Sequence, residues 1–197
     1  MALYHFSVRH VSRGKGQMVI ASAAYISGQR IFDSYYNKIH DYTSKSGVVF
    51  TEILTPEYVP ERLTDRETLW NEVEHVERNN KAQLAYSFDI ALQNELTLEE
   101  NIRLAKEFCQ EQFVARGMIV DLAIHEGKSD NEEEPDNPHF HVLVPIRPFT
   151  EEGIWGNKQR REYILDEDGN RVKDAKGKEM FNAVSTTGWN DPELLKE

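Results

Sequence analysis

The sequence contains one cysteine and no long run of apolar residues. Cys109 has no second cysteine to pair with, which excludes an intrachain disulfide and any zinc site built on several thiolates. A metal ion would therefore need histidines and carboxylates as ligands. A membrane-spanning helix needs about 18 to 20 consecutive apolar residues, and a secretory signal needs a charged start followed by an apolar stretch; the sequence has neither. We expect a soluble, cytoplasmic protein without membrane insertion.

Positive charge is also scarce, because the formal net charge is -11. Basic surfaces provide much of the affinity of proteins for nucleic acids, so this balance argues against a DNA-binding protein. The charges are unevenly distributed, however. Residues 1–45 carry six lysines and arginines against two aspartates, whereas residues 126–136 concentrate acidic side chains. Salt screens charges over about 8 Å under physiological conditions, so a basic cleft can coexist with an acidic surface elsewhere.

Four segments alternate between bulky apolar residues and small or polar ones, which is the pattern of strands with one face on a core. These segments are residues 3–11, 84–92, 118–125 and 139–147. A fifth, short strand is predicted near residues 48–54, where the chain reads VVFTEIL. The shared pattern predicts that the strands belong to one sheet.

Helical patterns lie between these strands. An alanine-rich helix is predicted to end at Gly28, a second helix to begin with the capping-box sequence TDRE at residues 64–67, and a third to begin at Thr97 with Glu100 in the capping-box position. The elements together favour an α+β fold. We expect a two-layer sandwich with a mainly antiparallel sheet, helices on one face and the active-site cleft on the other.

The length of 197 residues fits one domain that can bury a core without disulfides. We expect residues 1–150 to form its core. Residues 151–197 are predicted to add a basic segment, a hairpin with its turn at Asp168 and Gly169, and the start of a further helix, all within the same domain. Since the chain stops without an obvious ending, the full-length protein is expected to continue.

Three histidines on two predicted strands form the main candidate site. His139 and His141 are two residues apart, so both point to the same face of one strand. His125 ends the preceding strand and lies beside them if the two strands pair antiparallel across the acidic loop. Three imidazoles would leave coordination positions open for water and substrate, which suits a Lewis acid acting on a carbonyl or phosphoryl oxygen. The residues alone leave a structural or merely exposed role equally open.

The order and spacing of these blocks resemble the MobA/MobL (MobQ-type) family of conjugative relaxases, which are HUH endonucleases. The resemblance covers most of residues 1–150 and rests on YHFSVRHVSRGKGQMVIASAAYISG, LAYSFDIALQNELTLEEN, VDLAIHEG and NPHFHVLV. It implies site- and strand-specific nicking of single-stranded DNA at a plasmid transfer origin, beside an inverted repeat, for conjugative mobilisation. The implied partners are relaxosome accessory proteins and the coupling protein of a type IV secretion system, and the protein would travel with the DNA to the recipient cell.

The resemblance also identifies Tyr25, in AAYISG, as the nucleophile that forms a 5′-phosphotyrosyl intermediate. A phenol is a weak nucleophile at neutral pH, so a base or the field of a metal must assist it. Asp89 is the candidate base. Related proteins commonly carry glutamate at the position of Ser87, of Asp89 or of both. Because Ser87 cannot act as a carboxylate base, either Asp89 has this role or no carboxylate has it, and an exposed strand carboxylate is an equally open interpretation of Asp89.

The family resemblance makes His125, His139 and His141 the metal ligands, and the last two form its His-hydrophobic-His element. Three imidazoles favour manganese, zinc, cobalt or nickel, whereas magnesium is abundant and phosphate oxygens can help to hold it; we expect manganese or magnesium in use. Basic residues are candidates for DNA contacts: Arg9, Arg13, Lys15, Arg30 and Arg147.

Three other functions compete with this interpretation. A rolling-circle replication initiator would use the same histidines and tyrosine. A metal-dependent hydrolase would bind zinc through the histidines and leave Tyr25 as a packing residue, so no covalent DNA adduct would form. A DNA-binding module with a structural metal would not nick DNA and would be unimpaired by Tyr25→Phe.

Overall fold

The computed structural model describes residues 5–128 and 136–190. The chain divides into two compact units, residues 1–155 and residues 156–197. The first unit contains a sheet, three α-helices and all the predicted site residues. The second contains a two-stranded hairpin. That the second unit belongs to the same domain as the first stays a prediction.

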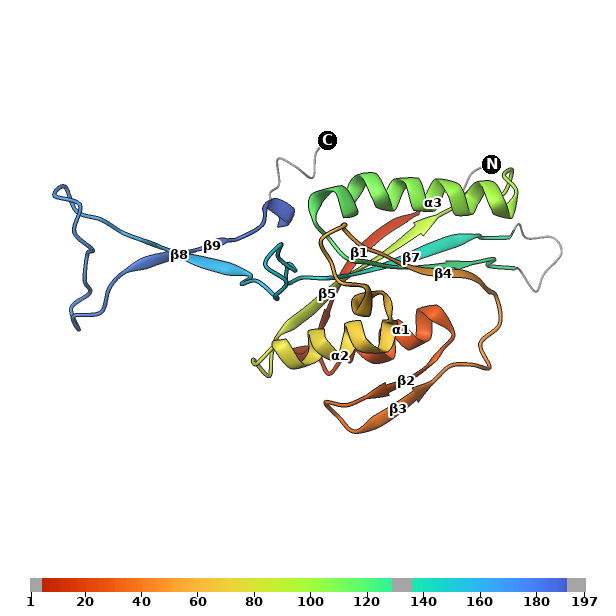
Figure 1. Cartoon of the computed structure of the whole chain (residues 1–197), viewed down its shortest axis with the longest axis horizontal. Helices are drawn as coiled ribbons and strands as arrows, with labels where there is room; N and C mark the ends of the chain where they lie inside the picture. Colours follow the sequence, from red (N-terminus) through yellow and green to blue (C-terminus); the bar gives the residue numbers. More distant parts are fainter. Residues whose placement is uncertain (1–4, 129–135, 191–197) are drawn as a thin grey trace. The chain divides into compact units, whose positions relative to one another are not determined.

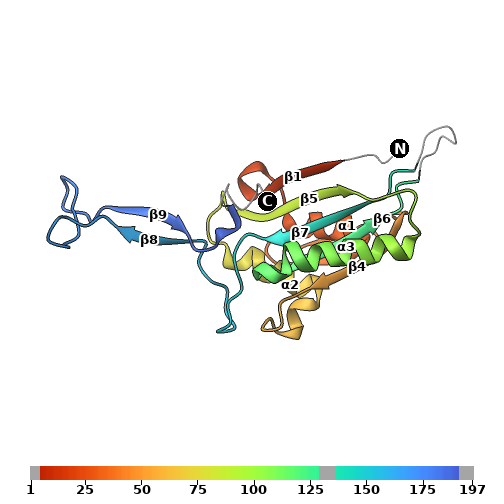
Figure 2. The same ribbon diagram turned by 90° about the horizontal axis from the view of Figure 1, so that it is seen from above.

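The first unit is built on a five-stranded sheet in which every pair of neighbouring strands is antiparallel (Figure 1 and Figure 2). The strands lie in the order β1 (Phe6–Ser12), β5 (Gln83–Ala91), β7 (His139–Pro145), β6 (Val120–His125) and β4 (Val48–Leu54). All five predicted strands are present. The two that carry the histidines, β6 and β7, are neighbours near the middle of the sheet.

Three α-helices pack on this sheet: α1 (Val19–Ser27), α2 (Arg66–Val76) and α3 (Leu98–Gln112). Short 3-10 helices lie at Arg13–Lys15, Glu61–Thr64, Val114–Arg116 and Gly188–Asn190. Within the described ranges, none of the helices is long and apolar enough to cross a membrane.

Two of the three helix boundaries follow the predicted signals. α1 ends at Gly28, whose φ of +64° lies in the left-handed region that favours glycine. α3 begins with the predicted capping box between Thr97 and Glu100. α2 begins one residue later than its motif suggests, because Thr64 belongs to the preceding 3-10 helix and Asp65 caps the first turn instead.

The helices cover both faces of the sheet (Figure 1). α3 covers the bulky apolar face, where the Phe108 and Phe140 ring centroids are 6.0 Å apart. α1 and α2 cover the other face, because small side chains such as Ala85 and Ala123 leave room for helices and are fully buried. The α+β class with an antiparallel sheet is therefore confirmed, whereas the prediction that helices occupy only one face is wrong. The end of the second face that carries His141 stays partly accessible.

A small hairpin of β2 (Arg30–Asp33) and β3 (Lys38–Asp41) follows α1 and packs beside it (Figure 1). Its buried polar side chains are Asp33 and His40. The Nε2 atom of His40 lies 3.4 Å from the Asp33 carboxylate. The chain then runs through residues 42–47 to β4. In this segment the Tyr42 backbone N–H donates to the backbone oxygen of Gln29, 3.1 Å away, so the loop passes the C-terminal end of α1.

The second unit is an antiparallel hairpin of β8 (Gln159–Tyr163) and β9 (Phe181–Ser185). Two tight turns lie between the strands, and in each an aspartate, Asp166 or Asp174, accepts hydrogen bonds from backbone N–H groups two and four residues later. The first of them contains the predicted turn, with Gly169 at a φ of +81°. The start of the predicted further helix falls in residues 191–197, outside the described residues.

Candidate active site at the end of the sheet

Three histidines meet where β6 and β7 pair. The antiparallel register places His125 opposite His139, and His141 opposite Ala123. One nitrogen from each of the three imidazoles lies within 4.8 Å of the other two. The predicted antiparallel pairing and the convergence of the three rings are therefore confirmed.

The second nitrogen of each imidazole faces a hydrogen-bond acceptor. His125 Nε2 donates to the backbone oxygen of Ile26 at 2.7 Å, and His139 Nδ1 donates to that of Asn137 at 2.8 Å. His141 Nδ1 donates to the Asp89 carboxylate. Since these oxygens can only accept, each ring keeps its lone pair on the opposite nitrogen. The lone pairs thus lie on His125 Nδ1, His139 Nε2 and His141 Nε2.

The free nitrogens fit a divalent metal ion. His125 Nδ1 and His141 Nε2 are 3.2 Å apart. Two nitrogens bound to one ion at about 2.0–2.1 Å are expected to be about 3.0–3.4 Å apart. Burial lowers the pKa of His125 to about 4 and also lowers the pKa of His139, so both rings are neutral at physiological pH, as metal ligands must be. The triad can therefore hold a metal.

Asp89 lies behind the triad, on β5. It is paired with His141 in the register of the sheet, and its carboxylate contacts both His141 Nδ1 and the Arg9 guanidinium. Ser7 Oγ donates to it as well, at 3.3 Å. The hydrogen bond from His141, followed by that from Arg9, holds the pKa of Asp89 well below its usual range. The carboxylate is thus ionised and fixes the orientation of a candidate metal ligand.

A hollow of about 220 Å³ opens beside this carboxylate. The residues that line it are His5, Asp89, Ala91, Asn137, His139 and His141. It lies at the accessible end of the sheet face and exposes two of the three histidines. A ligand in this hollow would meet His139, His141 and the Asp89 carboxylate.

Tyr25 lies beside the site, in the last turn of α1. Its side chain is 50% exposed, and its ring stands edge-on to Tyr42 with the centroids 5.4 Å apart. The next residue, Ile26, provides the backbone oxygen that holds His125. The Lys45 ammonium lies 3.6 Å from the centre of the Tyr25 ring. An exposed phenol, a cation and a candidate metal ligand are thus brought together by one turn of helix.

A glycine supports the strand end that carries the ligands. Gly127 has a φ of +59°, and a Cβ at this position would lie 1.9 Å from the backbone oxygen of Asn137. That oxygen is the acceptor for His139 Nδ1. Since no side chain fits here, we expect only glycine at position 127 to allow Asn137 to orient His139.

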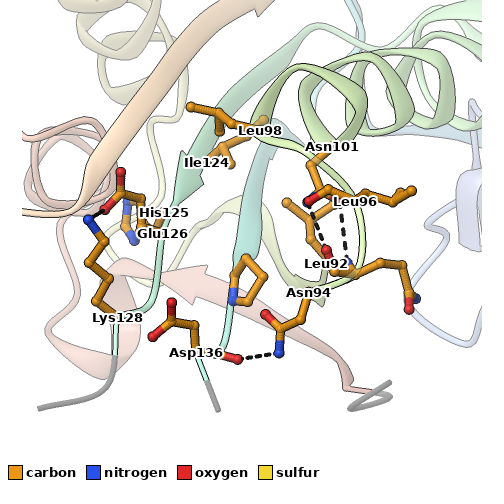
Figure 3. A pocket seen from close by; sticks show the side chains of 12 residues that line it. Leu92, Asn94, Leu96, Leu98, Asn101, Ile124, His125, Glu126, Lys128 and Asp136 are labelled. Atoms are coloured by element: carbon orange, nitrogen blue, oxygen red, sulfur yellow. Dashed lines mark hydrogen bonds and ion pairs between the residues drawn. The ribbon is translucent and has the colours of Figure 1, made fainter. Parts of the chain in front are cut away.

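A second hollow, of about 210 Å³, lies where β6 meets the loop after β5 and includes His125 in its wall (Figure 3). Two contacts join residues of its wall. Asn94 Nδ2 donates to the backbone oxygen of Asp136 at 2.5 Å, and the Lys128 ammonium lies 2.8 Å from the Glu126 carboxylate (Figure 3). The loop after β5 is thereby tied to the chain just before β7.

The basic residues predicted to contact DNA have different environments. Arg9 is 71% exposed next to Asp89, and Lys15 is exposed on the turn before α1. Arg30 is 58% exposed with its Nε 3.6 Å from Asp41. Arg147 is only 17% exposed, and its Nε donates to Glu77 at 2.9 Å. Arg9, Lys15 and Arg30 therefore keep surface that DNA can reach.

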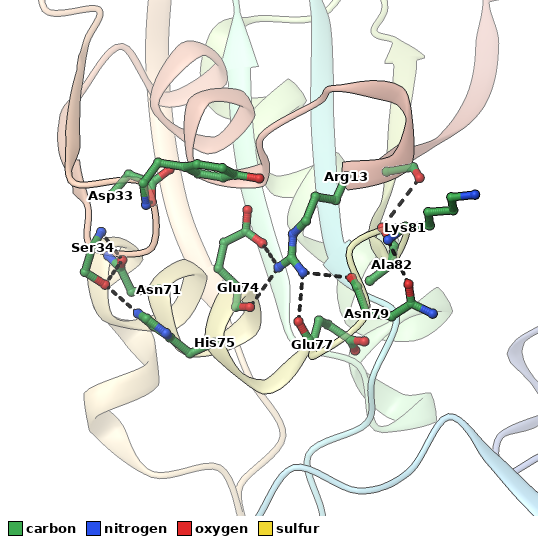
Figure 4. A network of polar contacts seen from close by, with 12 residues as sticks. Arg13, Asp33, Ser34, Asn71, Glu74, His75, Glu77, Asn79, Lys81 and Ala82 are labelled. Carbon is green, nitrogen blue, oxygen red and sulfur yellow. Dashed lines mark hydrogen bonds and ion pairs between the residues drawn. The ribbon is translucent and has the colours of Figure 1, made fainter.

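Arg13 does not fit the predicted DNA contact. Its side chain is 5% exposed, and its guanidinium donates to the backbone oxygens of Glu74, Glu77 and Asn79 and to the Glu74 carboxylate (Figure 4). The guanidinium therefore ties the turn before α1 to the C-terminal end of α2, where unpaired carbonyl groups need donors. Tyr35 covers it, 4.4 Å from the ring centre. Arg13 is a structural residue, and we correct its assignment.

Lys45 was not among the predicted site residues. In the sequence it contributes only to the basic excess of the first 45 residues, because its loop carries no pattern that fixes its position. The carbonyls of Ile26 and Asn137 were missed for the same reason, since backbone acceptors have no signature in the side-chain sequence. Only the fold brings these groups to the histidines.

The chain is similar in sequence to proteins named for conjugal transfer and mobilisation. The chain is 35% identical over 202 residues to "Conjugal transfer protein TraA" of Agrobacterium fabrum, covering 96% of this chain and 18% of that protein. It is 36% identical over 174 residues to "Probable mobilization protein MobA" of Bifidobacterium longum, covering 87% and 30%. This chain therefore spans less than a third of the length of either relative.

A solved structure shares the fold. The chain superposes with a TM-score of 0.79 and 34% sequence identity, over 99% of this chain and 86% of the other, on the structure described as "Molecular Basis of Vancomycin Resistance Transfer in Staphylococcus aureus". The model of the MobA/MobL family matches residues 17–197, nearly the whole chain. The chain therefore belongs to the MobA/MobL family of mobilisation proteins.

Proposed function

We propose that this chain is the nicking domain of a plasmid-mobilisation relaxase, with Tyr25 as nucleophile beside a metal held by His125, His139 and His141. One observation carries the proposal most directly. Tyr25, whose side chain is exposed, directly precedes Ile26 in the chain. The Ile26 carbonyl accepts a hydrogen bond from His125 Nε2 at 2.7 Å and thereby orients this proposed ligand. Nucleophile and candidate metal are thereby coupled through one turn of α1.

The reaction is a transesterification. The Tyr25 oxygen bonds to the scissile phosphorus while the bond between phosphorus and the 3′ oxygen breaks. The phenol proton passes to solvent, and the 3′ oxygen takes up a proton to become a free hydroxyl. The product is a 5′-phosphotyrosyl bond that a 3′ hydroxyl can attack again, so the strand can be resealed. A divalent metal in the triad, for which manganese and magnesium are the leading candidates, would neutralise charge on the nonbridging phosphate oxygens.

The contacts of Asp89 favour an orienting role over proton abstraction. Its carboxylate faces His141 and Arg9, and its pKa is lowered, so it is a weak proton acceptor. We assign it the task of fixing the His141 tautomer, so that Nε2 faces the metal. Arg9, Lys15 and Arg30 are proposed to contact the backbone of single-stranded transfer-origin DNA.

The names of the relatives favour mobilisation over plasmid replication, because "Conjugal transfer protein TraA" and "Mobilization protein MobL" of Acidithiobacillus ferridurans both refer to DNA transfer. This chain matches only part of the length of its relatives. We therefore propose for the whole protein that it assembles with accessory proteins of the relaxosome and with a coupling protein of a type IV secretion system. A hydrolase or a binding module is a weaker alternative, since neither needs an exposed tyrosine at the triad.

The decisive experiment is a search for the covalent adduct. The purified chain is incubated with labelled single-stranded transfer-origin DNA and Mn²⁺, with and without EDTA, and analysed on a denaturing gel. We expect a metal-dependent adduct with the wild type and with Tyr42→Phe, a matched control whose ring touches Tyr25, and none with Tyr25→Phe. An adduct that persisted in Tyr25→Phe would overturn the assignment of the nucleophile.

A further inference from the structure

Lys45 contacts both the backbone and the ring of Tyr25. Its Nζ donates to the backbone oxygen of Tyr25 at 3.0 Å and lies 3.6 Å from the centre of the same ring. These contacts come from a loop that is itself fixed, because the Lys45 backbone N–H donates to Tyr42 at 2.9 Å, and Tyr42 in turn is hydrogen-bonded to the residue after Gly28. These backbone hydrogen bonds therefore fix the loop from which the Lys45 side chain reaches Tyr25.

The groups that contact the ammonium attract a cation, whereas its burial opposes the charge. It lies against the C-terminal end of α1, where the carbonyl groups of a helix carry partial negative charge. The face of an aromatic ring attracts a cation as well. Lys45 is half-buried, and this burial lowers its pKa. Its charge contributes to the lowered pKa values of His125 and His139, so its field reaches the metal site.

We propose that Lys45 is a positioning residue for the nucleophile, holding the Tyr25 ring in place and keeping a positive charge beside the phenolate oxygen of the transition state. The inference rests on the proposed role of Tyr25. An ammonium has no lone pair, so in this role Lys45 faces the ring and removes no proton. Its effect is to hold the ring and to stabilise negative charge at the phenol oxygen. This charge exists only in the transition state, because the oxygen carries no negative charge in the free phenol or in the phosphotyrosyl ester.

This role predicts a specific kinetic pattern. The phenol before nicking and the ester after nicking both lack a negative charge at the tyrosine oxygen, so an ammonium that acts on that charge accelerates both directions equally. Loss of Lys45 should therefore slow nicking and resealing by the same factor and leave the equilibrium between nicked and sealed DNA unchanged. A lysine that only bound DNA would instead weaken DNA binding.

The test compares Lys45→Met, Lys45→Arg and the control Lys38→Met, which removes an exposed charge from β3. Single-turnover rates are measured with saturating DNA and Mn²⁺. We expect Lys45→Met to slow nicking and resealing about 10- to 100-fold with the DNA dissociation constant changed less than about twofold. Lys45→Arg should recover most of the rate, because a guanidinium can also lie over a ring and donate to a carbonyl. Lys38→Met should match the wild type.

A second readout does not depend on activity. In protein labelled with ¹³C-tyrosine, we expect Lys45→Met to shift the aromatic signals of Tyr25, assigned by their loss in Tyr25→Phe, and Lys38→Met to leave them in place. Equal nicking by Lys45→Met and the wild type would overturn the inference, as would a loss confined to DNA affinity. If the wild type formed no adduct through Tyr25 while the signals shifted, the proposed function would be at fault and the contact would stand as structural only.

Discussion

Asp89 and Asp121 lie on the same face of the same sheet, and each is paired with an arginine. Asp121, on β6, is fully buried; Arg66 Nε and Nη2 donate to it at 3.0 and 2.9 Å, and Trp70 Nε1 donates at 2.8 Å. Asp89, on β5, is partly accessible, and its donors are a candidate metal ligand and the exposed Arg9. One carboxylate is surrounded by groups of α2, and the other faces the site.

The two carboxylates differ because a helix covers Asp121 but not Asp89. α2 covers the part of the sheet face that carries Asp121, so the fold supplies all the donors and the ion pair fastens the helix to the sheet. Desolvation raises the pKa of Asp121 against the opposing effect of Arg66. At Asp89 the hydrogen bond from His141 acts in the other direction and lowers the pKa. The same residue type is structural where a helix covers it and contacts a candidate metal ligand where the face is open.

Removing the buried carboxylate should have the largest effect. Asp121→Ala leaves Arg66 Nε and Nη2 and the Trp70 N–H without their acceptor, while Arg66 Nη1 still donates to Gln29. Breaking a buried pair of this kind costs about 3–5 kcal/mol. We expect a matching loss in the free energy of unfolding, measured by urea denaturation. Asp41→Ala is the control, because its partner Arg30 is at the surface and the change should be small. Equal stability of the two variants would show that Asp121 does not fasten α2.

Removing the charge of the open carboxylate should affect the metal site and leave the fold intact. In Asp89→Asn, His141 keeps an acceptor but loses the negative charge that holds its tautomer, so we expect Mn²⁺ affinity to fall about 10- to 100-fold and nicking to fall with it. Titration calorimetry and the adduct gel measure the two effects. Asp89→Glu retains a carboxylate and should lose less. Unchanged metal affinity in Asp89→Asn would contradict the orienting role.

Lowering the pH should destabilise the end of the sheet that carries the three histidines, because protons bind His125 more readily in the unfolded state. An unfolded histidine takes up a proton near pH 6.5, whereas the folded ring does so only near pH 4, because burial lowers its pKa to about 4. Between these values the unfolded state binds more protons, so stability is highest at the upper end and falls as pH decreases from about 6.5 to 4. Asp89 stays ionised throughout this window, since its pKa is lowered.

The measurement is the urea midpoint of the metal-free chain, in EDTA, at several pH values, together with an NMR titration of the His125 ring. The midpoint of His125 is expected near pH 4. His125→Gln should flatten the dependence of stability on pH across the window. A midpoint of His125 near pH 6.5 would mean that the ring is solvated in the absence of metal, and the predicted loss of stability would then disappear.

Much of this comparison could be predicted from the sequence, because it depends on the period of the strands. Alternation placed Asp89 and His141 on one face, and two-residue spacing brought His139 to the same side. The pattern did not show which part of that face a helix covers. Small residues such as Ala85 and Ala123 suit both a cleft and a packed helix, so we predicted a cleft where α1 and α2 lie.

Arg13 and Lys45 show the second limit. Both are basic residues outside the α-helices and strands, and no local sequence pattern distinguishes them. Arg13 is buried because the carbonyls at the end of α2, some sixty residues later, need donors. Lys45 reaches Tyr25 because the β2–β3 hairpin returns its loop to the end of α1. Such positions depend on tertiary contacts that no local pattern encodes.

The smallest effect is expected from Arg9, the exposed partner of Asp89. Its side chain is 71% exposed, so water replaces the ion pair at little cost, and His141 continues to hold the carboxylate. Arg9→Gln should leave the urea midpoint unchanged and Mn²⁺ affinity within about twofold, but weaken single-stranded DNA binding and reduce its dependence on salt by about one phosphate contact. Arg103→Gln, on α3 over the opposite sheet face, is the control and should change neither. If Arg9→Gln lowered metal affinity as much as Asp89→Asn, Arg9 would be part of the support of the triad, and the open carboxylate would depend on its arginine as the buried one does.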